Sequence, residues 1–144
     1  MREVARDFPE DADIQTLYAE ALMDTTAWSY WLDDGSPKPE TEEILTALEA
    51  ALALNPNHIG ALHLYIHTVE ASADPYRGES IADRLGPLVP GAGHLVPMPS
   101  HIYLRVGRYE EPSTANELAA LADESYIAQC NAQGFYPALY YPHN

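Results

Sequence analysis

Two histidines and a glutamate stand at helical spacing near the middle of the chain: His63, His67 and Glu70. Residues three and four positions apart lie on one face of an α-helix, so a single face would carry both imidazoles and the carboxylate. Two imidazoles at this spacing can reach one ion, and zinc takes such nitrogen ligands together with carboxylate oxygens. The pattern therefore indicates half of a zinc or copper site, which a second segment must complete.

The residues that would complete such a site stand elsewhere in the chain. His101 is the third ligand that we predict, and Glu20 or His94 is expected to complete the shell. Histidines in a polar groove also hydrogen-bond tyrosines or carboxylates without any metal, and an H-x-x-x-H pattern alone is weak evidence. From the sequence we favour a groove that binds a partner, and a metal site at His63, His67 and His101 is the alternative.

Three prolines set a repeating frame in which these residues recur. Eleven residues after Pro9, Pro56 and Pro90 stand, in turn, Glu20, His67 and His101. The interval from Pro56 to Pro90 is 34 residues, the length of one helix–turn–helix repeat. The frame divides the chain into repeats at 9–56, 57–90 and 91–126, and an insertion at 24–40 lengthens the first of them. We expect the chain to be part of a longer protein.

Apolar periodicity and capping residues predict an all-α fold with helices at about 13–23, 41–54, 59–71, 77–88, 99–106 and 112–133. Pro37 and Pro39 mark the insertion at 24–40 as non-helical. Within it, Trp28, Tyr30 and Trp31 are expected either to cover the end of a groove or contact a ligand, or to hold the loop against the body. The aromatic, proline-rich tail at 134–144 is expected to pack on the last helix or on a continuation of the chain.

These features resemble the tetratricopeptide repeat (TPR) family. Segment 47–56, ALEAALALNP, is similar to the second helix of such a repeat with its closing proline, and segment 106–111, VGRYEE, is similar to the turn between two helices. Ala19, Ala51 and Ser100 stand where the family has small residues for close packing. Segment 93–103, GHLVPMPSHIY, resembles a subgroup of larger bacterial TPR proteins. The resemblance implies a superhelix of helix pairs, whose first helices line a concave groove.

The resemblance also implies a function, which is a scaffold that binds a partner protein or peptide rather than catalysis. In the repeat frame the groove would be lined by Asp13, Thr16, Glu20, His63, His67, Glu70, His94 and His101. Where the family often places Lys, Arg and Asn to clamp a peptide carboxylate, this chain has histidines and acids. Because uncapped ends of a repeat array tend to associate, a structural module that self-associates is a third alternative.

Composition argues against several classes of partner. The net charge is −15 and the isoelectric point is near 4.4, so the phosphate backbone of a nucleic acid would be repelled. The sequence has no run of 18 apolar residues, so no membrane insertion is expected. It also lacks the G-x-S-x-G elbow and the glycine-rich phosphate loops, and we predict no catalytic residue. The lone Cys130 is expected to be a small buried residue of the last helix.

Overall fold

Helices account for all the regular structure that the computed structural model describes, which is residues 1–26, 28–90, 94–134 and 138, without the side chains of 111–115 and 118. One isolated β-bridge joins Trp31 and Pro37, and this part of the chain has no β-strand. The all-α prediction is confirmed. The elements are α1 (Arg2–Asp7), α2 (Ala12–Thr26), α3 (Pro39–Leu54), α4 (Ile59–Val69), the 3-10 turn η1 (Pro75–Gly78), α5 (Glu79–Leu88), α6 (Met98–Val106) and α7 (Glu110–Cys130).

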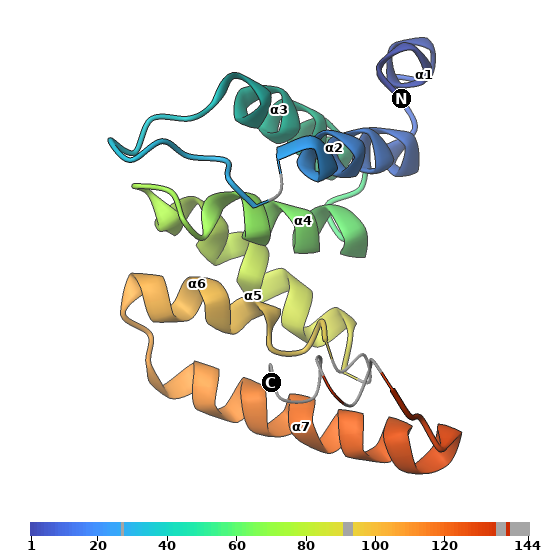
Figure 1. The fold of residues 1–144 in the computed structure, drawn as a ribbon, viewed down its shortest axis with the longest axis vertical. Coiled ribbons are helices and arrows are strands. Elements are labelled where there is room, and N and C mark those ends of the chain that lie inside the picture. The colour runs from blue at the N-terminus through green and yellow to red at the C-terminus, as the bar shows by residue number, and fades with distance from the viewer. Residues whose placement is uncertain (27, 91–93, 135–137, 139–144) are drawn as a thin grey trace.

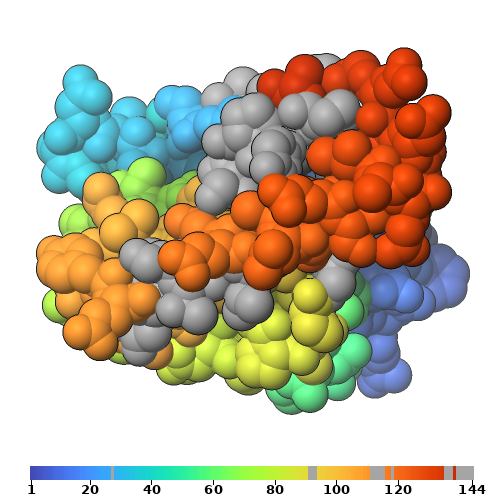
Figure 2. Space-filling view, turned by 90° about the horizontal axis from the view of Figure 1, so that it is seen from below, coloured from blue at the N-terminus to red at the C-terminus, as the bar shows by residue number. Residues whose placement is uncertain are grey.

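The helices stack in chain order as three consecutive pairs, α2 with α3, α4 with α5 and α6 with α7 (Figure 1). The first helices of the pairs also contact one another, because α4 packs against both α2 and α6. Seen from below, α7 lies across the end of the stack (Figure 2). This arrangement makes α4 the central helix of one layer, and α4 carries His63 and His67.

Local side-chain chemistry explains where several helices begin and end. The carboxylate of Asp11 accepts a hydrogen bond from the backbone amide of Ile14 at 3.0 Å, which caps the start of α2. His58 caps α4, because its Nδ1 accepts from the amide of Ala61 at 3.0 Å. Gly107 ends α6 with a φ of 85°, a left-handed conformation that glycine adopts without a steric penalty.

A continuous apolar core holds α4 in place between its neighbours. Fully buried side chains from four helices meet there, including Leu48, Leu62, Ile66, Leu85 and Ile102. The small residues Ala19, Ala51 and Ser100 are all buried. Close-packed interiors give little freedom to move, so the core fixes the direction in which the opposite face of α4 points.

The insertion between α2 and α3 is shorter than the predicted range 24–40. Helix α2 continues through Thr26, and Pro39 opens α3 instead of standing in the loop. Proline fits the first helical position because that residue has no intrahelical partner for an N–H group. The indole Nε1 of Trp31 donates to the carbonyl of Thr68 on α4 at 2.7 Å, and Tyr30 is buried, so these two rings hold the loop against the body.

The C-terminal part differs from one prediction. Cys130 is exposed, so its assignment as a buried residue was wrong. Cys130 is the last residue of α7, and its amino-acid type alone does not show whether another part of the chain covers that end of the helix. The predicted tail at 134–144, His143 included, lies outside the described residues except for 134 and 138. None of the helices that the structure describes combines the length and apolar character needed to cross a bilayer.

Candidate metal centre

A row of three hollows follows the layer formed by α2, α4 and α6. Their volumes are about 460, 480 and 450 Å³. The first two share Glu20, His63 and Leu64 and therefore form one continuous depression, which we call the α2–α4 groove. The residues predicted to line a groove lie in the walls of these hollows: Asp13, Thr16, Glu20 and His63 in the first, Glu20, His63, His67 and His94 in the second, and Glu70 and His101 in the third.

Four histidines gather in the middle of this row, and we call His63, His67, His94 and His101 the histidine cluster. The ring centroids of His63 and His67 are 4.8 Å apart, those of His63 and His94 are 5.4 Å apart, and those of His67 and His101 are 5.6 Å apart. Helix α4 supplies two of the rings, the turn before α6 supplies His94, and α6 supplies His101. Three separate segments therefore bring their imidazoles to one place.

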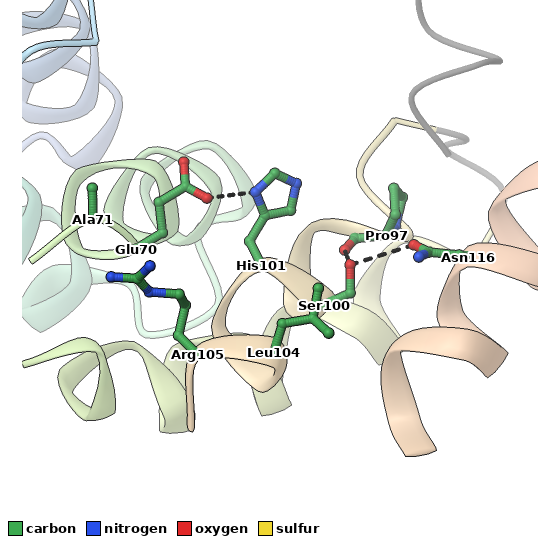
Figure 3. Close-up of a pocket in the computed structure, with 8 residues that line it drawn as sticks. All are labelled: Glu70, Ala71, Pro97, Ser100, His101, Leu104, Arg105 and Asn116. Atoms are coloured by element: carbon green, nitrogen blue, oxygen red, sulfur yellow. Dashed lines mark hydrogen bonds and ion pairs between the residues drawn. The ribbon is translucent and has the colours of Figure 1, made fainter. Parts of the chain in front are cut away.

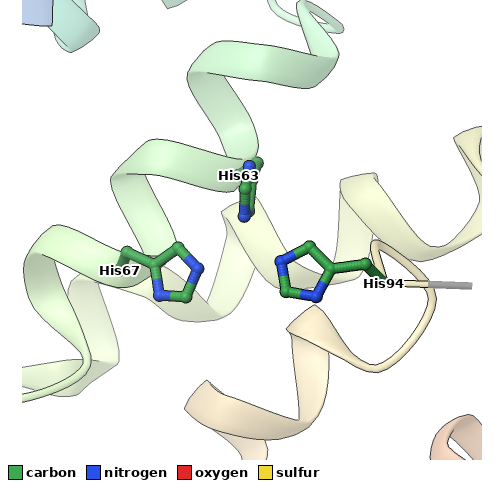
Figure 4. A group of neighbouring side chains, drawn as sticks. All are labelled: His63, His67 and His94. Carbon is green, nitrogen blue, oxygen red and sulfur yellow. The ribbon is translucent and has the colours of Figure 1, made fainter. Parts of the chain in front are cut away.

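The structure contains two sets of potential metal ligands among the described residues. Within each set, the ligand atoms lie within 4.8 Å of one another. The first is formed by His63, His67 and His94, and the second by His67, Glu70 and His101. Figure 4 shows the first set, with a ring nitrogen of His67 and one of His94 turned toward His63. The predicted trio of His63, His67 and His101 is thus divided between two sets that share His67. Of the two residues predicted to complete the shell, His94 stands in the first set and Glu20 belongs to neither.

Glu70 links the two sets. Its carboxylate accepts a hydrogen bond from Nδ1 of His67 at 3.1 Å and another from Nδ1 of His101 at 2.5 Å. Burial raises the pKa of Glu70, but the hydrogen bonds from His101 and His67 outweigh that effect and lower the pKa to about 2. Figure 3 shows the Glu70–His101 pair in the wall of the third hollow. At neutral pH this carboxylate is therefore ionised and engaged with both rings.

His63 is the member of the cluster whose environment most disfavours a proton. Burial lowers its pKa, and the neighbouring His67, His94 and His101 lower it further, to about 3. Its Nε2 atom is buried and has no hydrogen-bond partner among the described residues. A buried polar nitrogen without a partner costs free energy, so this atom marks a point where a ligand would be stabilising.

Trp28 borders the cluster from the loop. Its ring centroid lies 4.8 Å from that of His67 in an edge-to-face arrangement, while 68% of the residue remains exposed. Its φ of 68° is a left-handed conformation that is strained for a bulky side chain. The aromatic residues of this loop therefore do not share one role. Trp31 and Tyr30 hold the loop, and Trp28 lies beside the site.

The far end of the groove is built differently. Asp13 accepts from Nε2 of His58 at 2.7 Å, and the Thr16 hydroxyl donates to the carbonyl of Ala12 at 2.8 Å. These side chains support the ends of α2 and α4, and in the described part of the chain they belong to neither set of potential metal ligands.

Searches for known relatives gave no match to any protein-family model, curated protein or solved structure.

Proposed function

We propose that this protein binds a divalent transition-metal ion through His63, His67 and His94. The observation that carries the proposal is the buried Nε2 of His63, which faces two further imidazoles and has no hydrogen-bond partner among the described residues. The low pKa of His63 keeps the ring neutral, which is the form that donates a lone pair to a metal. Binding an ion would satisfy this nitrogen and link α4 to the turn before α6.

The donor set selects the kind of metal. Imidazole nitrogens suit zinc, copper and nickel, whereas magnesium and calcium require oxygen ligands. The thiol of Cys130 belongs to neither set of potential ligands in the described residues, so the site has no sulfur donor there. We therefore propose zinc or copper as the resident ion. A site with three histidines and one further coordination position is also the arrangement found in catalytic zinc proteins.

The test is a zinc titration of the purified, chelator-treated protein. We expect one zinc ion per chain by calorimetry, and a higher melting temperature in the presence of zinc. Free zinc at 100 times the dissociation constant would stabilise the folded state by about 2.7 kcal/mol through mass action. Magnesium at the same concentration should leave the melting temperature unchanged. Absence of zinc binding, or equal stabilisation by magnesium, would reject the proposal.

We also propose a second function, which is that the pairs of helices form a TPR-like superhelix whose α2–α4 groove binds a basic peptide segment. The observation that favours it is the continuity of the two hollows, since they share three lining residues. Exposed Glu20 and Asp24 line the groove, and the net charge of −15 attracts cations. The partner is therefore expected to present lysines or arginines to this wall.

Fluorescence anisotropy with a labelled lysine-rich peptide tests this second proposal. We expect binding that weakens with salt, and a several-fold loss of affinity in Glu20→Lys. Glu117→Lys is the matched control, because it makes the same charge change at an exposed position of α7. Equal losses in the two variants would show that the peptide responds to net charge alone and not to the groove.

A further inference from the structure

We infer that Glu70 is a positioning residue that fixes the tautomers of His67 and His101, and that it thereby keeps the lone pair of His67 on Nε2 for the metal bound by His63, His67 and His94. The inference rests on the proposed metal site and adds to it a support outside the coordination shell. Its basis is the pair of hydrogen bonds that Glu70 accepts from Nδ1 of His67 and Nδ1 of His101.

The hydrogen bonds decide which nitrogen of each ring can bind a metal. An ionised carboxylate can only accept hydrogen bonds, so both Nδ1 atoms that face Glu70 must carry the hydrogen. A neutral imidazole has one N–H group and one lone pair, which leaves the lone pair of His67 and of His101 on Nε2. Carboxylates orient metal-bound histidines in other proteins in this way, through the ring nitrogen that does not touch the metal.

The distances argue against Glu70 as a direct ligand. Zinc bonds to nitrogen and oxygen of about 2.0–2.2 Å place two donors of a tetrahedral site about 3.4 Å apart. The Glu70 oxygens lie only 3.1 Å from Nδ1 of His67 and 2.5 Å from Nδ1 of His101. Both distances are those of direct hydrogen-bond contact, with no room for an ion between the two atoms. The second set of potential ligands is therefore the support of the first.

His67 connects the proposed metal site to the Glu70–His101 pair. His67 is a neighbour of every other part of the site, since its ring lies 4.8 Å from His63 and 5.6 Å from His101 between centroids. Glu70 follows His67 by three residues, at the C-terminal end of α4, so the same helix face presents both. Because the carboxylate joins α4 to α6, it also fixes the distance between these two helices.

Glu70→Gln separates this role from that of a simple ion pair. The amide oxygen can accept from one ring, but the amide nitrogen must donate to the other ring. That second histidine then has to expose a lone pair on Nδ1 and carry its hydrogen on Nε2, and His67 in that form can no longer present a lone pair on Nε2 to the metal. The matched control is Glu49→Gln, which removes a carboxylate that pairs with Arg77 away from the cluster.

The first measurement uses the metal-free protein, so it does not depend on whether a metal binds. Long-range proton–nitrogen NMR correlation at pH 8 should show His67 and His101 protonated on Nδ1, and one of them should change to Nε2 in Glu70→Gln. Glu49→Gln should keep both Nδ1 tautomers. If either ring of the wild-type protein carries its hydrogen on Nε2, the inference is overturned.

The second measurement uses copper(II) as the probe. Electron paramagnetic resonance of the copper-loaded protein should show the same three imidazole nitrogens in the wild type, in Glu49→Gln and in His101→Ala. The copper affinity of Glu70→Gln should fall by about 10- to 100-fold. Unchanged copper affinity in Glu70→Gln would overturn the inference while leaving the metal site intact. A wild-type protein that binds no copper or zinc would instead reject the metal site, whatever tautomers are observed.

Discussion

Replacing His67 by alanine should remove the zinc-dependent rise in melting temperature. His67 belongs to both sets of potential ligands and is only 7% exposed, so no other side chain in the described residues occupies the same central position. The stabilisation lost would be the mass-action contribution of the bound ion, about 2.7 kcal/mol at a zinc concentration 100 times the dissociation constant. The quantity to measure is the difference between melting temperatures with and without zinc, because the substitution also breaks the hydrogen bond to Glu70.

His58→Asn is the control for this experiment. His58 caps the same helix but lies outside the cluster, and asparagine retains the ability to cap α4. Its zinc-dependent shift should equal that of the wild type. A zinc-dependent shift that persists in His67→Ala, or that disappears in His58→Asn, would place the metal somewhere other than the histidine cluster.

Acidification of the metal-free protein from pH 7 to pH 5 should lower its free energy of unfolding by about 2 kcal/mol through His63 alone. In the unfolded chain this imidazole binds a proton as the pH falls through about 6.5, whereas burial and the neighbouring histidines hold its folded-state pKa at about 3. Between these values the unfolded state binds more protons, so stability is present above pH 6.5 and decreases as the pH falls. Each pH unit within the interval is equivalent to about 1.4 kcal/mol.

Urea unfolding of wild-type protein and His63→Leu at both pH values, with a chelator present, measures this contribution. The leucine variant should lose about 2 kcal/mol less than the wild type over the same interval, because its side chain does not titrate. Glu70 does not confuse the comparison, since its folded-state pKa is lowered and its own effect appears only below the unfolded value near 4.5. Equal losses in the two proteins would show that His63 does not resist protonation in the folded state.

The sequence by itself determined the helices and the face on which the histidines stand. Apolar periodicity and caps predicted α2, α3, α4, α5, α6 and α7 to within three residues at each end, because they are local properties of the chain. The same local geometry placed His63, His67 and Glu70 on one face of α4. It placed the start of α3 two residues late, because a proline that would break a helix interior is also a favoured first residue.

Only the tertiary structure decided how the histidines are combined. His94 is 27 residues from His67 along the chain, and whether it or His101 meets His63 depends on the course of the turn before α6 and on the packing of α6 against α4. The role of Glu70 is also tertiary, since the sequence shows its spacing from His67 but not that its second oxygen reaches His101 on another helix. Spacing within a helix follows from the backbone alone, whereas contacts between helices depend on how side chains far apart in sequence pack together.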